Sequence, residues 1–156
     1  KQSPWRCNTT IDKTLEHFKK DGNVLLVSLD NNVKEESETE IKLPYITDKA
    51  QLALYYSAAS AFIFPSKADT SPLVVREAIL SGTPVCAYGV GGIPELIEPG
   101  VTGYCANPND IDDFIIGVEN VLGYPISPDK IKELAEKWSY QRMANDYLDL
   151  YKEVIS

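Results

Sequence analysis

Short apolar runs alternate with longer amphipathic stretches along most of the chain. Consecutive apolar positions are typical of strands buried on both faces of a parallel sheet. The predicted strands cover residues 24–29, 41–43, 61–64, 84–88 and 103–105. Because helical stretches separate most of these strands, the pattern predicts right-handed crossovers and one α/β domain with a doubly wound, Rossmann-like parallel sheet.

Apolar residues spaced three or four positions apart predict the helices. Capping residues support three helix starts, because Asp48, Ser127 and Ser139 carry side-chain oxygens that can accept from first-turn amides. Residues 31–40 are instead polar, acidic and without a period, which predicts a solvated loop. The predicted helices include residues 11–18, 48–59, 111–122 and 127–138, and a long last helix after Ser139.

Composition narrows the classes of function. A chain of 156 residues suits one domain, and 15 basic against 23 acidic residues give a net charge of -8. That balance argues against a general nucleic-acid binder, which presents a basic stripe. With one histidine and no Cys-x-x-Cys pair, no metal site or cofactor is expected. The three scattered cysteines fit a reducing cytoplasm, and no apolar run is long enough to span a bilayer.

Ligands on doubly wound sheets bind beyond the carboxyl ends of the strands, so the loop after Phe64 is informative. If a helix begins with Pro72 as its first residue, the amides of Leu73 and Val74 form an anion site at its positive end. Asp69 and Glu77 lie on either side, where carboxylates suit sugar and ribose hydroxyls. On spacing alone, the commoner alternative is that Asp69 is a carboxylate at a helix start and Glu77 is a solvated helix residue.

A second loop lies after residues 84–88 and contains Gly91 and Gly92. Adjacent glycines allow the backbone to approach a ligand closely, although such a pair also occurs in plain tight turns. Together the two loops favour a nucleotide-sugar site over the alternative that each motif is a chance match.

Taken together, these stretches resemble the C-terminal half of glycosyltransferase family four, whose GT-B fold consists of two facing Rossmann-like domains. The resemblance covers roughly residues 10–154 and rests on many short segments. They are Tyr45-Ile46-Thr47-Asp48, Ala61-Phe62-Ile63-Phe64-Pro65-Ser66, Glu77-Ala78, Ser81-Gly82-Thr83-Pro84-Val85, Gly91-Gly92-Ile93-Pro94-Glu95, Gly100-Val101-Thr102-Gly103-Tyr104 and Trp138-Ser139-Tyr140.

The resemblance implies roles for individual residues. Glu77 matches the second glutamate of the family's paired motif, which binds the donor ribose, and Asp69 matches the first, which contacts sugar hydroxyls. These two residues are therefore the candidate catalytic pair. Backbone amides around Ser71, Leu73 and Val74 match the diphosphate-binding segment, and Gly91 and Gly92 belong to the same donor site. Tyr45 and Ile46 match the segment near the base.

The chain also departs from the family pattern. Asp69 is one methylene shorter than the usual glutamate, and Thr70-Ser71-Pro72 replaces Gly-Phe-Gly, which removes one amide donor at Pro72. Thr9-Thr10 stands where a Lys-Gly pair is typical, so an expected phosphate cation is absent. Arg6 and Lys67 are candidate replacements.

These features predict the donor-binding domain of a retaining transferase that moves a hexose from a nucleotide diphosphate sugar to a hydroxyl acceptor, in polysaccharide or glycoconjugate synthesis. Residues 1–9 are expected to be the remnant of an interdomain linker, and residues 10–156 the domain itself. The expected partner is a missing N-terminal domain that binds the acceptor. Peripheral membrane association of the protein is expected only through that domain. The isolated chain is expected to be inactive. The alternatives are a nucleotide-sugar epimerase and a non-catalytic module with a degenerate site.

Overall fold

The computed structural model describes residues 8–20, 22, 24–29 and 35–155. The helices are α1 (Asn8–Lys19), α2 (Lys49–Ala58), α3 (Leu73–Leu80), α4 (Ile111–Val121), α5 (Pro128–Lys137) and α6 (Tyr140–Ile155), with a short 3-10 helix η1 (Ile93–Glu95). The strands are β1 (Leu26–Leu29), β2 (Glu35–Glu36), β3 (Glu40–Leu43), β4 (Phe62–Phe64), β5 (Val85–Tyr88) and β6 (Gly103–Ala106).

Strands β4, β5 and β6 form a parallel sheet in that order, which we call the larger sheet. Every residue of the central strand β5 is fully buried. Val85 and Ala87 belong to one hydrophobic cluster and Cys86 and Tyr88 to another, so alternate side chains enter separate cores. The prediction of strands buried on both faces is therefore confirmed for β5.

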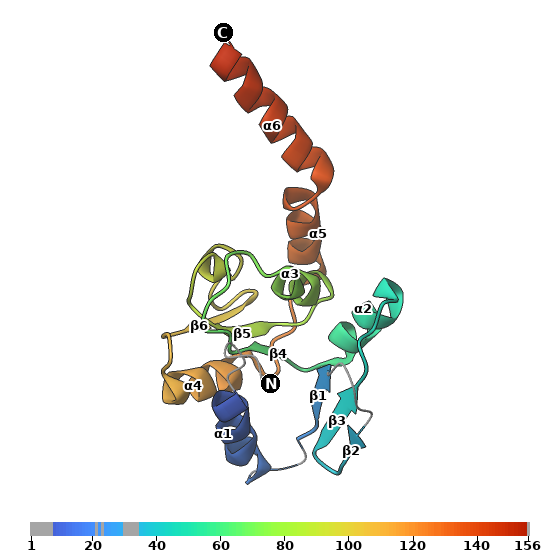
Figure 1. Ribbon diagram of the computed structural model, residues 1–156, viewed down its shortest axis with the longest axis vertical. Coiled ribbons are helices and arrows are strands. Elements are labelled where there is room, and N and C mark those ends of the chain that lie inside the picture. Colours follow the sequence, from blue (N-terminus) through green and yellow to red (C-terminus); the bar gives the residue numbers. More distant parts are fainter. Residues whose placement is uncertain (1–7, 21, 23, 30–34, 156) are drawn as a thin grey trace.

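Helices cover both faces of the larger sheet (Figure 1). Val75, Ala78 and Ile79 of α3 fill the first cluster, while Phe114 and Val118 of α4 fill the second. Helices α2 and α5 pack against α3, and α1 packs against α4. This three-layer arrangement confirms the Rossmann-like α/β class predicted from the alternating pattern.

The N-terminal helix α1 is joined to the second layer by polar contacts. The Thr10 and Tyr88 hydroxyls form a buried hydrogen bond of 3.1 Å. Nearer the other end of α1, His17 Nε2 lies 2.8 Å from Glu119 Oε1 on α4. The start of the described chain is thus held against residues 78 and 102 positions later.

Strands β1, β3 and β2 form a second three-stranded sheet, in which β1 and β3 are parallel and β2 is antiparallel to β3. We call it the smaller sheet because β2 has only two residues. Among the described residues, the hydrogen-bonded ladders therefore form two sheets, whereas the sequence predicted one. The predicted loop at 31–40 is also wrong at Glu35, Glu36 and Glu40, which lie in strands β2 and β3. Glu35 and Glu36 pair with Lys42 and Ile41 through the backbone, and such pairing needs no apolar period.

The smaller sheet is also less buried than predicted. On β1 the side chains alternate between half-buried and exposed, with Val27 44% exposed and Leu29 36% exposed. Two-sided burial is therefore wrong for this strand. An apolar run predicts a strand, but the helices needed to bury both of its faces must come from other parts of the molecule.

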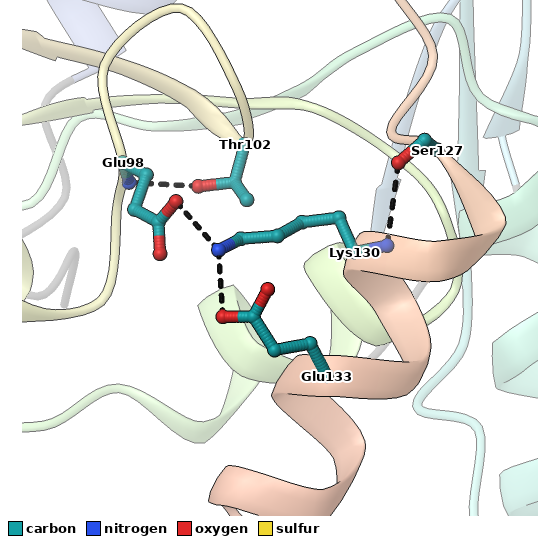
Figure 2. Close-up of polar contacts among 5 residues, drawn as sticks. All are labelled: Glu98, Thr102, Ser127, Lys130 and Glu133. Carbon is teal, nitrogen blue, oxygen red and sulfur yellow. Dashed lines mark hydrogen bonds and ion pairs between the residues drawn. The ribbon is translucent and has the colours of Figure 1, made fainter.

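The start of α5 is fastened by the polar cluster in Figure 2. Ser127 caps the helix by accepting from the Lys130 amide at 3.2 Å, as predicted. Lys130 Nζ lies 2.8 Å from Glu98 and 2.9 Å from Glu133, and these two acceptors raise the lysine pKa. Glu98 is itself held because its amide donates to the Thr102 hydroxyl at 2.8 Å. The cluster therefore links α5 to the turn before β6.

Helix α6 extends away from the rest of the molecule (Figure 1). Ser139 caps it by accepting from the Arg142 amide at 3.2 Å, as predicted. None of the residues of α6 is buried. Its large exposed apolar side chains are Tyr140, Met143, Tyr147, Leu148, Leu150, Tyr151, Val154 and Ile155. Within the described part of the chain, no helix combines the length and the apolar character that crossing a membrane requires.

Candidate functional site

Two loops meet at the carboxyl edge of the larger sheet, one after β4 and one after β5. The Gly92 amide donates to the Asp69 carbonyl at 3.3 Å. A Cβ atom at Gly91 would lie 1.9 Å from the Asp69 carbonyl oxygen, and one at Gly92 would lie 2.0 Å from that of Thr70. Only glycine fits at these two predicted positions, because the backbone of one loop contacts the backbone of the other there.

The loop between Asp69 and Pro72 is closed by a local hydrogen bond. Asp69 Oδ1 accepts from the Ser71 amide at 3.0 Å, which is a common way for an aspartate to fix a turn. The Ser71 hydroxyl in turn accepts from Arg76 Nη2 at 3.2 Å. Of the three predicted diphosphate-binding amides, that of Ser71 thus already has a partner inside the loop.

Helix α3 begins one residue later than predicted. Pro72 is its N-cap, with φ -67° and ψ 118°, and Leu73 is the first helical residue. The extended ψ of Pro72 explains the shift, since a first helical residue needs a helical ψ angle. The amides of Leu73 and Val74 still lie in the first turn, where no carbonyl within the helix can accept from them. The end of α3 therefore keeps its capacity to bind an anion.

Glu77 lies in the second turn of α3 and is exposed. Its Oε2 accepts from the Tyr56 hydroxyl of α2 at 3.4 Å. Burial, and then the charge of Glu77 and this hydrogen bond, raise the pKa of Tyr56 to about 12. Tyr56 also packs edge-on against Phe62, with ring centroids 5.4 Å apart, and its carbonyl accepts from the Thr83 hydroxyl. Glu77 is thus supported by a neighbouring helix while its carboxylate remains accessible.

Sequence reasoning missed Tyr56 and Arg76. Tyr56 is half-buried and contacts α3 through Glu77, whereas its neighbour Tyr55 is 39% exposed. An apolar period does not separate two adjacent tyrosines. Arg76 gave no signal because a single arginine beside a motif residue is ordinarily a solvated charge.

The other predicted donor-binding residues are more scattered. Lys67 is exposed on the loop after β4, beside Asp69 in sequence. Tyr45, which is 70% exposed, and the half-buried Ile46 follow β3 of the smaller sheet. Arg6 lies outside the described residues. The structure therefore brings together Asp69, Ser71, Gly91 and Gly92 at one edge, with the amides of Leu73 and Val74 and the carboxylate of Glu77 on the adjoining helix.

Known proteins with similar sequences are sugar-transferring enzymes. A sulfoquinovosyl transferase from Arabidopsis thaliana is 39% identical over 75 residues, which are 46% of this chain and 15% of that protein. The structure of sucrose-phosphate synthase from Thermosynechococcus elongatus matches 94% of this chain and 42% of its own, with a TM-score of 0.72 and 20% identity.

The structure of HepE from Anabaena in complex with UDP-glucose matches 78% of this chain and 38% of its own, with a TM-score of 0.55 and 21% identity. The chain therefore spans less than half of the length of each of these proteins. Both solved structures share its fold. The model of the family described as "Glycosyl transferases group 1" matches residues 32–138, and by this match over more than half of its length the chain belongs to that family.

Proposed function

We propose that this chain binds the nucleoside diphosphate part of a nucleotide-sugar donor and supplies the donor half of a retaining hexosyltransferase. The observation that carries the proposal is the juxtaposition at the carboxyl edge of the larger sheet. There the first turn of α3 lies directly after a loop that Gly91 and Gly92 pack against, and Glu77 follows one turn later. Membership of the glycosyl transferase family and the fold shared with a UDP-glucose complex support the same reading.

The proposed role of each amide and carboxylate follows from its chemistry. The amides of Leu73 and Val74 and the positive end of α3 attract the diphosphate. In this proposal the Glu77 carboxylate accepts hydrogen bonds from ribose hydroxyls, and the Asp69 carboxylate accepts from sugar hydroxyls. During transfer the bond between the anomeric carbon and the diphosphate breaks, a bond to the acceptor oxygen forms on the same face, and the acceptor hydroxyl loses its proton to the departing diphosphate. The amides would stabilise the charge that develops on the departing diphosphate.

The acceptor side is proposed to come from a further domain of a longer protein. Two observations support this. The chain spans 15–42% of the proteins compared above, and the apolar side chains of α6 are exposed along its whole length. The proposal uses amide, hydroxyl and carboxylate groups and includes no metal or cofactor. A cytoplasmic location and a role in polysaccharide or glycoconjugate synthesis remain part of the same proposal.

Glu77→Gln is the direct test of the ribose contact. A charge-assisted hydrogen bond contributes about 1.5–3 kcal/mol, so affinity for a nucleoside diphosphate should fall about tenfold or more. The measurement is calorimetric titration with UDP, GDP, ADP and dTDP and with their hexose derivatives, in the presence of a chelator. Glu133→Gln is a matched control, because Glu133 is exposed on α5 and contacts Lys130 instead.

Two outcomes would contradict the proposal. Unchanged affinity with a large loss of stability would make Glu77 a structural partner of Tyr56. Absence of binding to every base and sugar at millimolar concentration, in the whole protein that contains this chain, would favour the non-catalytic module.

A further inference from the structure

One arginine connects the loop of the proposed donor site to the hydrophobic core. Arg76 lies on α3 immediately before Glu77, and its Nη2 donates to Ser71 Oγ at 3.2 Å. Its guanidinium carbon lies 5.6 Å from the centroid of the Trp138 ring, a cation–π contact. Trp138 ends α5 and packs against the core cluster that contains Val75 and Leu134. Arg76 thus joins a well-supported aromatic ring to the loop that precedes its own helix.

The guanidinium fixes the direction of the hydrogen bond at Ser71. Arginine carries donors and no acceptor, so Ser71 Oγ must be the acceptor in this contact. A serine hydroxyl that accepts one hydrogen bond keeps its own hydrogen for a second partner. The Ser71 amide is already committed to Asp69. The hydroxyl is therefore the donor that Ser71 can offer to an incoming anion.

The charge of Arg76 is not neutralised at close range. Among the ion pairs between residues that the structure describes, none includes Arg76, and its buried Nε has no hydrogen-bond partner. Arg76 and Asp146 both line an open concavity of about 370 Å³. Asp146 nevertheless pairs with Arg142, at 3.0 Å. A cation without a carboxylate partner beside the loop favours a bound anion there.

We propose that Arg76 is a positioning residue of the donor site, which holds the Ser71 hydroxyl so that its hydrogen is available to the diphosphate of the donor. The inference rests on the proposed function and deepens it. It also provides a substitute for the amide donor lost at Pro72, one of the departures from the pattern of the family that the chain resembles.

The test is a double-mutant cycle on the whole protein that contains this chain, with UDP, GDP and ADP as the probes. Arg76→Met and Ser71→Ala should each weaken binding of the preferred nucleotide by about threefold to tenfold, the range of one hydrogen bond. Removing a cation also weakens anion binding through long-range attraction. Lys132→Met is the control for that effect, because it removes an exposed cation from α5.

The Ser71→Ala background separates two roles of Arg76, which are holding the serine hydroxyl and attracting the anion through its charge. If Arg76 acts through the serine hydroxyl, Arg76→Met should cost clearly less affinity once that hydroxyl is gone. Equal losses in both backgrounds would overturn the proposal and leave a plain electrostatic effect. Arg76→Lys keeps the charge and the stem over Trp138 and can donate to Ser71, so it should bind more tightly than Arg76→Met.

A measurement without ligand separates this inference from the proposed function. Amide hydrogen exchange at Ser71 should become faster in Arg76→Met than in the unaltered protein, because the loop loses its connection to Trp138. Unchanged exchange would overturn the positioning role. If the unaltered protein binds none of the three nucleotides, the proposed function fails, and with it the part of the inference that concerns the diphosphate.

Discussion

The larger and the smaller sheet differ in what covers them. Strand β5 is buried on both faces, between clusters supplied by α3 and α4. Strand β1 has a similar apolar sequence, yet Val27 and Leu29 are substantially exposed. Apolar character alone does not bury a strand, because a parallel sheet is stabilised only where helices cover its faces. The larger sheet and its helices should therefore supply most of the stability of this chain, and the proposed site lies at its edge.

The largest expected effect comes from making the same substitution in each sheet. Val85→Ala removes two methyl groups from a fully buried side chain and should lower the free energy of unfolding by about 2–3 kcal/mol. Val27→Ala, at a side chain that is 44% exposed, should lower it by about 1 kcal/mol or less. Urea denaturation followed by circular dichroism measures both. Equal losses would mean that the smaller sheet is as well covered in solution as the larger.

The next effect tests whether close packing continues from the larger sheet into the site loops. Gly92→Ala places a Cβ 2.0 Å from the Thr70 carbonyl oxygen and should cost about 1–3 kcal/mol. It should also weaken nucleotide binding, because the Asp69 loop must move. Gly100→Ala is the control: with φ at 75° and open space around it, it should cost about 1 kcal/mol and leave binding unchanged. Identical binding by both variants would contradict the loop-to-loop role of Gly92.

The smallest effect concerns Tyr56, which connects α2 to the larger sheet. Its pKa is raised from 10.0 to about 12, so the folded state holds the phenolic proton more tightly than the unfolded state does. The resulting stabilisation is complete below pH 10 and is lost as the pH rises toward 12. Tyr56→Phe should therefore lose less stability than the unaltered protein over that interval, as measured by urea denaturation at several pH values. Parallel losses would show that Tyr56 titrates normally.

The sequence predicted the larger sheet well because its signals were local. Continuous apolar runs marked β4 and β5, and Ser127 and Ser139 capped the helices that they were expected to cap. The smaller sheet was predicted less well. Strand β2 consists of two glutamates that pair through their backbones, and side-chain patterns carry no information about such pairing.

At the site, the motif residues were predictable and their supports were not. Family resemblance singled out Asp69, Ser71 and Glu77 as candidates. Their partners Arg76 and Tyr56 depend on which side chains the folded backbone brings together. The sequence predicted that the glycine pair allows a close approach of the backbone to a ligand. In the structure the close approach is instead to the loop at Asp69 and Thr70.

The attachment of α1 has a consequence for synthesis on the ribosome. Thr10 bonds to a residue 78 positions later, and His17 to one 102 positions later. Chains emerge from their N-terminal end, so α1 leaves the ribosome long before β5 and α4 exist to receive it. Until then Phe18, which packs against the cluster that contains Tyr88 and Phe114, has no native surface to cover, and a chaperone that binds exposed apolar helices could bind there. Helix α1 is thus made before the other described helices of this chain, yet it must wait for β5 and α4 before it reaches its place.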